Sequence, residues 1–182
     1  MLKTLIIETC SEEQTIMLGE AIGKILEPGD VIYLEGDLGS GKTRLAKGII
    51  SAATCVSADE VVSPSFTLIN RFEGDFPVYH ADLYRIDADQ VEDIGLEEPL
   101  SSGSALVVEW AEKMPPTGDP VLEAVIQYAE KECFRKIVFQ WSDDGPWANR
   151  FTEALSAWTG IETYAPTAQQ ESVPEAILEG LK

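Results

Sequence analysis

The stretch Gly36-Asp37-Leu38-Gly39-Ser40-Gly41-Lys42-Thr43 determines how the rest of the sequence is interpreted. It has the pattern G-x-x-x-x-G-K-[ST], in which glycines let the backbone wrap closely around an anion. The apolar run Val31–Leu34 precedes it and predicts a strand buried on both faces. Apolar residues at helical spacing follow it: Leu45, Ala46, Ile49, Ile50 and Ala53. Strand, glycine-rich loop and helix in this order are typical of a phosphate-binding loop (P-loop).

This loop predicts a site for ATP with Mg²⁺. The Lys42 ammonium is expected to bridge the β and γ phosphates, and the Thr43 hydroxyl to be a Mg²⁺ ligand. The helix that begins at Lys42 adds the positive end of its dipole. We therefore assign ATP binding to Gly36, Asp37, Leu38, Gly39, Ser40, Gly41, Lys42 and Thr43, and count Lys42 among the catalytic residues.

Two carboxylates are candidates for the metal and for catalysis. Glu109 ends the apolar run Leu106–Val108, where P-loop proteins place a metal-binding carboxylate, although Asp is commoner there. The alternative is that Glu109 is only the first polar residue after a strand. Asp82 is the second candidate, for positioning a metal or water, and strand alternation puts it on one face with His80 and Tyr84. We interpret His80 itself as structural.

A candidate nucleotide-sensing switch precedes the Asp82 strand. Ser63-Pro64-Ser65-Phe66-Thr67 supplies three hydroxyls and a rigid proline between the P-loop helix and the next strand. P-loop proteins often place their switch segment there, so Ser63, Ser65 and Thr67 are switch candidates. An ordinary turn into a strand explains the same pattern equally well.

The remaining patterns predict an α/β fold, a P-loop NTPase-like mixed sheet flanked by helices with an antiparallel hairpin portion. A first strand is expected at 4–7, and a helix from the N-cap Ser11, with Gln14 reaching back, to about Leu26. The strands Phe66–Phe72 and Pro77–Tyr84 are joined by so short a turn that they must form a hairpin.

Further elements are expected along the second half of the chain. They are a short helix at Asp89–Ile94, strands at Ala105–Val108, Val121–Tyr128 and Cys133–Trp141, and a helix opened by Pro146 with the apolar stripe Phe151, Leu155 and Trp158. We divide the chain into a P-loop domain, 1–145, and a C-terminal helix and tail, 146–182, of which 161–182 has little pattern and is expected to be partly disordered.

Composition narrows the class of partner. The formal net charge of −19 disfavours direct binding of DNA or RNA, because affinity for a phosphate backbone depends on Lys and Arg. No apolar run approaches the roughly 18 residues of a membrane span, and no signal-peptide pattern is present, which favours the cytoplasm.

Cys10, Cys55 and Cys133 fit neither a disulfide framework nor a zinc site and are expected to be buried, reduced thiols.

Four ordered motifs resemble the TsaE (YjeE) family. They are the P-loop, Ser63-Pro64-Ser65-Phe66-Thr67-Leu68, His80-Ala81-Asp82-Leu83-Tyr84-Arg85 and Glu109-Trp110-Ala111-Glu112, and they span roughly residues 4–140. Two positions depart from the usual family pattern: Ser65 stands where Thr is usual, and Ala111 where Pro is frequent. Neither is an expected phosphate or metal ligand.

The resemblance implies an ATPase of the machinery that makes threonylcarbamoyladenosine at position 37 of tRNA, slow alone and acting through a complex with TsaB and TsaD. It implies that Lys42 and Thr43 bind phosphate and Mg²⁺, that Glu109 completes the metal site, that Asp82 supports hydrolysis and that Trp110 lies beside the nucleotide. The tRNA would be contacted only indirectly, through the complex.

Two other functions fit a P-loop. One is a small-molecule kinase, for which Arg71, Arg85 and Lys113 are the nearest candidates for basic lid residues. The other is a scaffold gated by ATP with negligible turnover. Neither an NKxD sequence nor a DxxG switch is present, so a GTPase is disfavoured.

Overall fold

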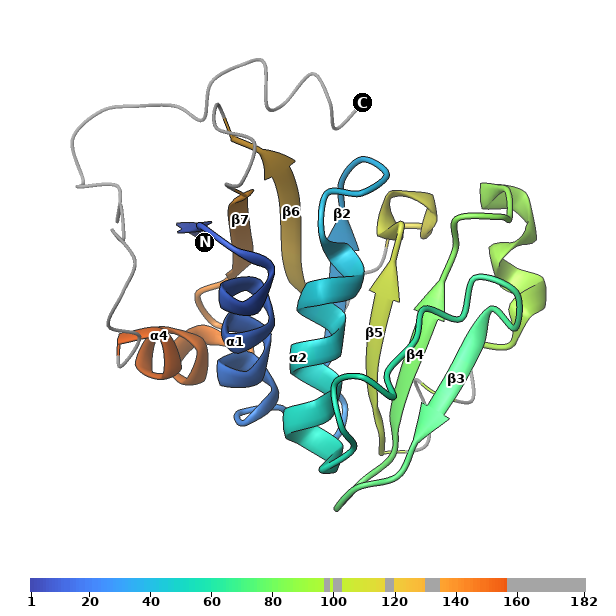
Figure 1. The fold of residues 1–182 in the computed structure, drawn as a ribbon, viewed down its shortest axis with the longest axis horizontal. Coiled ribbons are helices and arrows are strands. Elements are labelled where there is room, and N and C mark those ends of the chain that lie inside the picture. Colours follow the sequence, from blue (N-terminus) through green and yellow to red (C-terminus); the bar gives the residue numbers. More distant parts are fainter. Residues whose placement is uncertain (97–98, 100–102, 117–119, 130–134, 157–182) are drawn as a thin grey trace.

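A mixed β-sheet runs through the molecule in the computed structural model, which describes residues 1–96, 99, 103–116, 120–129 and 135–156 (Figure 1). In this part of the chain, seven strands pair in the order β1-β7-β6-β2-β5-β4-β3. Their bounds are β1 Leu2–Thr9, β2 Val31–Glu35, β3 Ile69–Phe72, β4 Val78–Asp82, β5 Ala105–Glu109, β6 Leu122–Tyr128 and β7 Arg135–Ser142. The helices are α1 Glu12–Gly23, α2 Lys42–Thr54 and α4 Ala148–Ser156, with 3₁₀ helices η1 Ala88–Ile94 and η2 Ala111–Lys113.

The centre of the sheet is parallel and its margins are antiparallel. β2 pairs in parallel with β5 and β6, and β5 pairs in parallel with β4. β3, β7 and β1 each pair antiparallel with their neighbours. Every residue of β4 and β5 is buried, as expected for central strands covered on both faces. The mixed sheet with flanking helices and an antiparallel hairpin, β3–β4, is confirmed.

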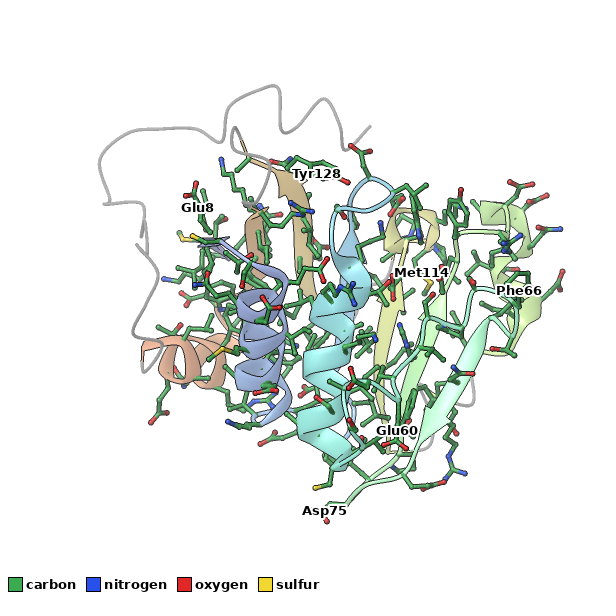
Figure 2. The ribbon with its side chains drawn as sticks, viewed as in Figure 1. Glu8, Glu60, Phe66, Asp75, Met114 and Tyr128 are labelled. Atoms are coloured by element: carbon green, nitrogen blue, oxygen red, sulfur yellow. The ribbon has the colours of Figure 1, made fainter. Side chains whose placement is uncertain are left out.

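Parallel pairing brings the carboxyl ends of the central strands to one edge of the sheet. The register sets Asp82, the last residue of β4, beside Glu109, the last residue of β5, and Leu34 of β2 also pairs with Glu109. The P-loop follows β2 at this edge. Figure 2 labels Tyr128 near the same edge, and Glu60 and Asp75 near the opposite one. Ligand sites of open α/β sheets form at such an edge.

The helices α1, α2 and α4 lie over one face of the sheet (Figure 1). The backbones of α1 and α2 touch, since a Cβ on Gly48 would lie 2.0 Å from the carbonyl oxygen of Ile16, and one on Gly19 2.4 Å from that of Leu45. The largest core cluster lies between these helices and the sheet, and it includes Trp147, Phe151 and Leu155 of the α4 region. The P-loop helix is therefore held rigidly against α1.

A second apolar cluster covers the other face of the central strands. It contains Val31 and Tyr33 of β2, Leu106 and Val108 of β5, and Val91 of η1. Residues alternate between the two clusters along each central strand, which fixes the face on which every side chain lies.

Several element boundaries differ from the sequence-based expectation. β3 begins at Ile69 instead of Phe66, because Leu68 has a positive φ of 66° and its N–H closes a turn onto the carbonyl of Pro64. β4 is shorter than expected, and α1 ends at Gly23. Ser11 caps α1 as expected, but the Gln14 side chain accepts from the N–H of Cys10 and not from that of Ser11.

At the C-terminal end, the predicted helix begins at Ala148, two residues after Pro146. Trp158 and the tail 161–182 lie outside the described residues, so the division at 145/146 stays a prediction. Phe151 and Leu155 are buried as the predicted stripe requires.

Two of the cysteines contradict their expected burial. Cys10 and Cys55 are free but exposed, because they flank helices: Cys10 precedes the N-cap of α1 and Cys55 caps the end of α2. Cys133 lies outside the described residues. No helix in the described part of the chain combines the length and apolarity needed to cross a membrane.

Candidate nucleotide-binding site

The P-loop adopts a backbone conformation that only glycine accommodates readily. Gly36, Gly39 and Gly41 have φ values of 136°, 79° and 114°. A Cβ on Gly36 would also lie 2.2 Å from the carbonyl oxygen of Ile126 in the neighbouring strand. Gly41 is the N-cap of α2, and no side chain of the described residues caps that end. The first N–H groups of α2 are therefore available to an anion.

Lys42 is buried at the centre of this loop. Its Nζ donates hydrogen bonds to the carbonyl oxygens of Gly36 and Asp37, at 2.5 and 2.9 Å, and lies 3.7 Å from the ring centroid of Trp110. Burial lowers the pKa of Lys42, and the nearby Glu109 carboxylate acts in the opposite direction. The cation is thus held where the phosphates of a nucleotide would meet it.

Trp110 has an unusual backbone conformation for its size. Its φ is +62°, in the left-handed region, and its ring packs on that of Tyr84 at a centroid distance of 4.9 Å. Such conformations in large residues persist where the surroundings determine them, and they gather at ligand sites. The contact with Lys42 places Trp110 beside the P-loop. That it lies beside the nucleotide, as the family resemblance implies, stays a prediction.

Thr43 and Glu109 meet across the site. The Thr43 hydroxyl donates to Oε2 of Glu109 at 2.8 Å, and Nε2 of His80 lies 2.9 Å from Oε1 of the same carboxylate. A hydroxyl and a carboxylate are hard oxygen donors, the chemistry that Mg²⁺ prefers, so these residues fit the expected metal. The described residues contain no group of three or more His, Cys, Asp or Glu that could hold a metal by themselves.

Asp82 lies next to Glu109 in the sheet but has other partners. Oδ2 of Asp82 accepts a short hydrogen bond from the hydroxyl of Ser63, and Oδ1 accepts from the N–H of Tyr84 at 2.9 Å. Ser63 and Ser65 both line the cavity beside the P-loop. Thr67 is not among its lining residues, and its hydroxyl donates to the side chain of Asn70. Two of the three switch candidates therefore face the site.

These groups share one cavity of about 830 Å³. That volume falls in the usual range for small-molecule and cofactor sites. Its wall includes the P-loop, Cys10 and Ser11 before α1, Glu12 and Thr15 of α1, the two serines, Asp82 with Tyr84 and Arg85, Glu109 with Trp110, and Arg135.

Sequence reasoning missed the residues that support the P-loop from β6 and β7. The Tyr128 hydroxyl donates to the carbonyl of Leu38 at 3.0 Å, and Nε of Arg135 donates to that of Ser40 at 2.8 Å. The guanidinium of Arg135 also lies 4.6 Å from the centroid of the Tyr128 ring. No spacing in the sequence relates Arg135 to a loop 95 positions earlier, so only the sheet order could have placed it there.

The three basic residues considered as lid candidates have different surroundings. Nζ of Lys113 donates to the carbonyl oxygens of Leu83, Tyr84 and Ile86, each at 2.8 Å. Arg71 forms an ion pair with Glu73 at 3.0 Å. Arg85 lines the cavity, with its guanidinium 4.3 Å from the ring centroid of Phe66.

The chain is similar to several known proteins. The chain is 41% identical over 136 residues to the tRNA threonylcarbamoyladenosine biosynthesis protein TsaE of Aquifex aeolicus, covering 74% of this chain and 96% of that protein. It is 38% identical over 125 residues to the protein of the same name from Nostoc, covering 66% of this chain and 76% of the relative. The fold is similar to the crystal structure of Bacillus subtilis YdiB, with a TM-score of 0.68 and 32% sequence identity. The alignment covers 88% of this chain and 99% of the YdiB chain.

The family model described as threonylcarbamoyl adenosine biosynthesis protein TsaE matches residues 9–137, which include the P-loop, the Ser63 segment and both candidate carboxylates. The chain therefore belongs to the TsaE family.

Proposed function

We propose that this protein is the Mg-dependent ATPase component of tRNA threonylcarbamoyladenosine biosynthesis, the process for which its TsaE relatives are named. The observation that carries the proposal is the contact of Thr43 with Glu109 beside the buried Lys42. It joins the P-loop to the carboxylate that we propose binds the metal, and P-loop ATPases combine these two parts.

Each residue has a distinct role in the proposed site. Backbone N–H groups of the P-loop and the Lys42 ammonium bind the phosphates, while Thr43 and Glu109 hold Mg²⁺. The metal, when bound with ATP, neutralises charge on the phosphate oxygens. Asp82, supported by Ser63, orients the attacking water, and Trp110 packs beside the nucleotide.

The cavity favours hydrolysis over transfer to a small-molecule acceptor. A kinase clamps the transferred phosphate with basic residues. Lys113 directs its described hydrogen bonds to three backbone carbonyls, and Arg71 pairs with Glu73, which leaves Arg85 as the one cavity-lining member of the three candidates. Arg44 and Arg135 also line the cavity, but Arg44 forms an ion pair with Glu12 and Arg135 donates to the carbonyl of Ser40. Arg85 by itself is a weak basis for a kinase lid.

The partners follow from the charge and from the family. A chain of net charge −19 is a poor ligand for tRNA, so we propose that it acts on tRNA indirectly, in a cytoplasmic complex with TsaB and TsaD. The segment that contains Ser63 and Ser65 is the proposed sensor of the γ-phosphate. Association with TsaB–TsaD should accordingly depend on ATP, and turnover by the isolated chain should be slow.

Reconstitution tests this proposal. Phosphate release from ATP is measured with the purified chain, with and without TsaB–TsaD, beside the Lys42→Ala variant and beside nucleotide-dependent pull-down of the complex. We expect slow release alone, faster release in the complex, loss of release in the variant and pull-down with ATP but not ADP. Pull-down that is equal with ATP, ADP and no nucleotide would refute gating. Normal turnover by Lys42→Ala would refute the assigned site.

A further inference from the structure

His80 is a buried polar residue that the proposed roles do not use. It lies in the middle of β4, its side chain is 0% exposed, and Nε2 lies 2.9 Å from Oε1 of Glu109. A carboxylate oxygen only accepts hydrogen bonds, so Nε2 carries the proton and donates it. Nδ1 has no hydrogen-bond partner among the described residues. The described hydrogen bonding of the imidazole is therefore directed at Glu109.

The sheet register produces this contact. β4 and β5 are parallel, with His80 paired to Val107 and Asp82 paired to Glu109. Alternation places His80 and Glu109 on the face covered by α2, the same face as Val107 in the larger core cluster. Residues two positions apart on neighbouring strands are diagonal neighbours, within reach of long side chains. The imidazole thus reaches along the sheet to the end of β5.

The two oxygens of Glu109 consequently have separate partners. Oε2 accepts from the Thr43 hydroxyl and Oε1 is contacted by His80. The terminal torsion of a glutamate is broad, so a carboxylate with one free oxygen can rotate. With Oε1 held from the side of β4, Oε2 is directed at the P-loop.

We propose that His80 is a positioning residue that holds the Glu109 carboxylate in the orientation required to bind the Mg²⁺ that accompanies the nucleotide. This inference rests on the proposed function, because it assumes that Glu109 is a metal ligand. Hydrogen-bond partners of ligating carboxylates typically change metal affinity or activity by 10- to 100-fold when they are removed. A histidine that only filled the core would have no such effect on the metal.

The test compares two polar replacements that differ by one methylene. The amide nitrogen of His80→Gln can approach the position of Nε2, whereas that of His80→Asn is too short to reach Glu109. For each full-length variant and for the unmodified chain, binding of a fluorescent ADP analogue is measured across a Mg²⁺ titration and again in EDTA. Thermal unfolding is recorded in parallel.

We expect His80→Asn to need about 10-fold more Mg²⁺ for half-maximal binding, with an unchanged affinity in EDTA. His80→Gln should need nearly the same Mg²⁺ concentration for half-maximal binding as the unmodified chain. Identical Mg²⁺ dependence in the two variants, equal weakening in EDTA, or failure of both variants to fold would overturn the positioning role. If binding by the unmodified chain itself does not depend on Mg²⁺, the proposed function fails instead.

Discussion

Carboxylates lie on both faces of the sheet near the edge where β2, β4 and β5 end, but their surroundings differ. On the face covered by α2, Glu109 and Asp82 are buried and each accepts two hydrogen bonds in the described structure. On the other face, the side chains of Glu35 at the end of β2 and of Glu123 on β6 are half-buried and form no hydrogen bond or ion pair with the described residues. Hydrogen bonds therefore hold the carboxylates of Glu109 and Asp82 in place, whereas those of Glu35 and Glu123 are not held in this way.

These surroundings raise the pKa values of Glu35 and Glu123. Burial, with the charges of Glu112 and Glu123, raises the pKa of Glu35 to about 7, and burial raises the pKa of Glu123. An unpaired carboxylate that loses water favours its protonated form. The comparison indicates that burial alone does not distinguish the two pairs, whereas the hydrogen bonds from the P-loop and from the Ser63 segment do, and we expect the hydrogen-bonded pair to be the functional one. Four substitutions test this distinction.

Glu109→Gln should have the largest effect. It keeps the size of the side chain and removes the charge that faces Thr43 and the metal. We expect Mg²⁺-dependent ATP hydrolysis to fall by about 1,000-fold while nucleotide binding in EDTA persists. Phosphate release and binding of a fluorescent nucleotide measure the two quantities. Normal hydrolysis by this variant would show that Glu109 is not the metal carboxylate.

Asp82→Asn separates the two carboxylates of the α2 face. The two carboxylate oxygens of Asp82 accept hydrogen bonds from Ser63 and from the N–H of Tyr84. The asparagine amide keeps one of these oxygens and carries no negative charge. We expect a loss of about 100-fold in the hydrolysis rate, with the Mg²⁺ concentration for half-maximal nucleotide binding unchanged. If instead Asp82→Asn abolishes Mg²⁺ dependence and Glu109→Gln does not, the two roles are reversed.

Ser63→Ala removes one partner of Asp82 and leaves the carboxylate in place. Hydrogen bonds to charged groups contribute about 1.5–3 kcal/mol, and the lower end of that range corresponds to roughly a 10-fold loss of hydrolysis rate, which we expect here because the carboxylate keeps its bond from the N–H of Tyr84. Thr67→Ala is the matched control, since Thr67 lies on the same segment but does not line the cavity. Equal losses in the two variants would point to the segment as a whole, not to the Ser63–Asp82 contact.

Glu35→Gln should have the smallest effect on hydrolysis and a measurable effect on stability. The folded-state pKa of Glu35, about 7, lies above its unfolded value, so the folded chain loses stability as the pH rises from about 4.5 to 7. Glutamine does not ionise, so the variant does not lose stability in this pH range. We expect it to be more stable by about 1 kcal/mol at pH 8, an amount discounted because the side chain is partly exposed, and equal at pH 4.5.

Denaturant unfolding of Glu35→Gln and of the unmodified chain at pH 8 and pH 4.5 measures the difference in their free energies of unfolding. A stability gain of the same size at both values would exclude ionisation of Glu35 as its cause. A large loss of ATP hydrolysis in this variant would contradict the distinction between the two faces.

The sequence by itself determined the P-loop, the mixed α/β class and the β3–β4 hairpin. These features depend on neighbours in the chain: glycines at fixed offsets before a helix, apolar runs that become buried strands, and a turn too short for a parallel crossover. It also identified Glu109 as a candidate, because it ends an apolar run, and Asp82, because it lies near the end of a predicted strand.

Only the tertiary structure decided which side chains meet. Thr43 and Glu109 are 66 positions apart, His80 and Glu109 are 29 apart, and Arg135 reaches the P-loop across 95 positions. These contacts depend on strand order and register, which no local pattern encodes. His80 shows the consequence most clearly. In the sequence it is one histidine in a strand, and its contact with Glu109 exists because parallel pairing sets β4 beside β5 and directs both side chains toward α2.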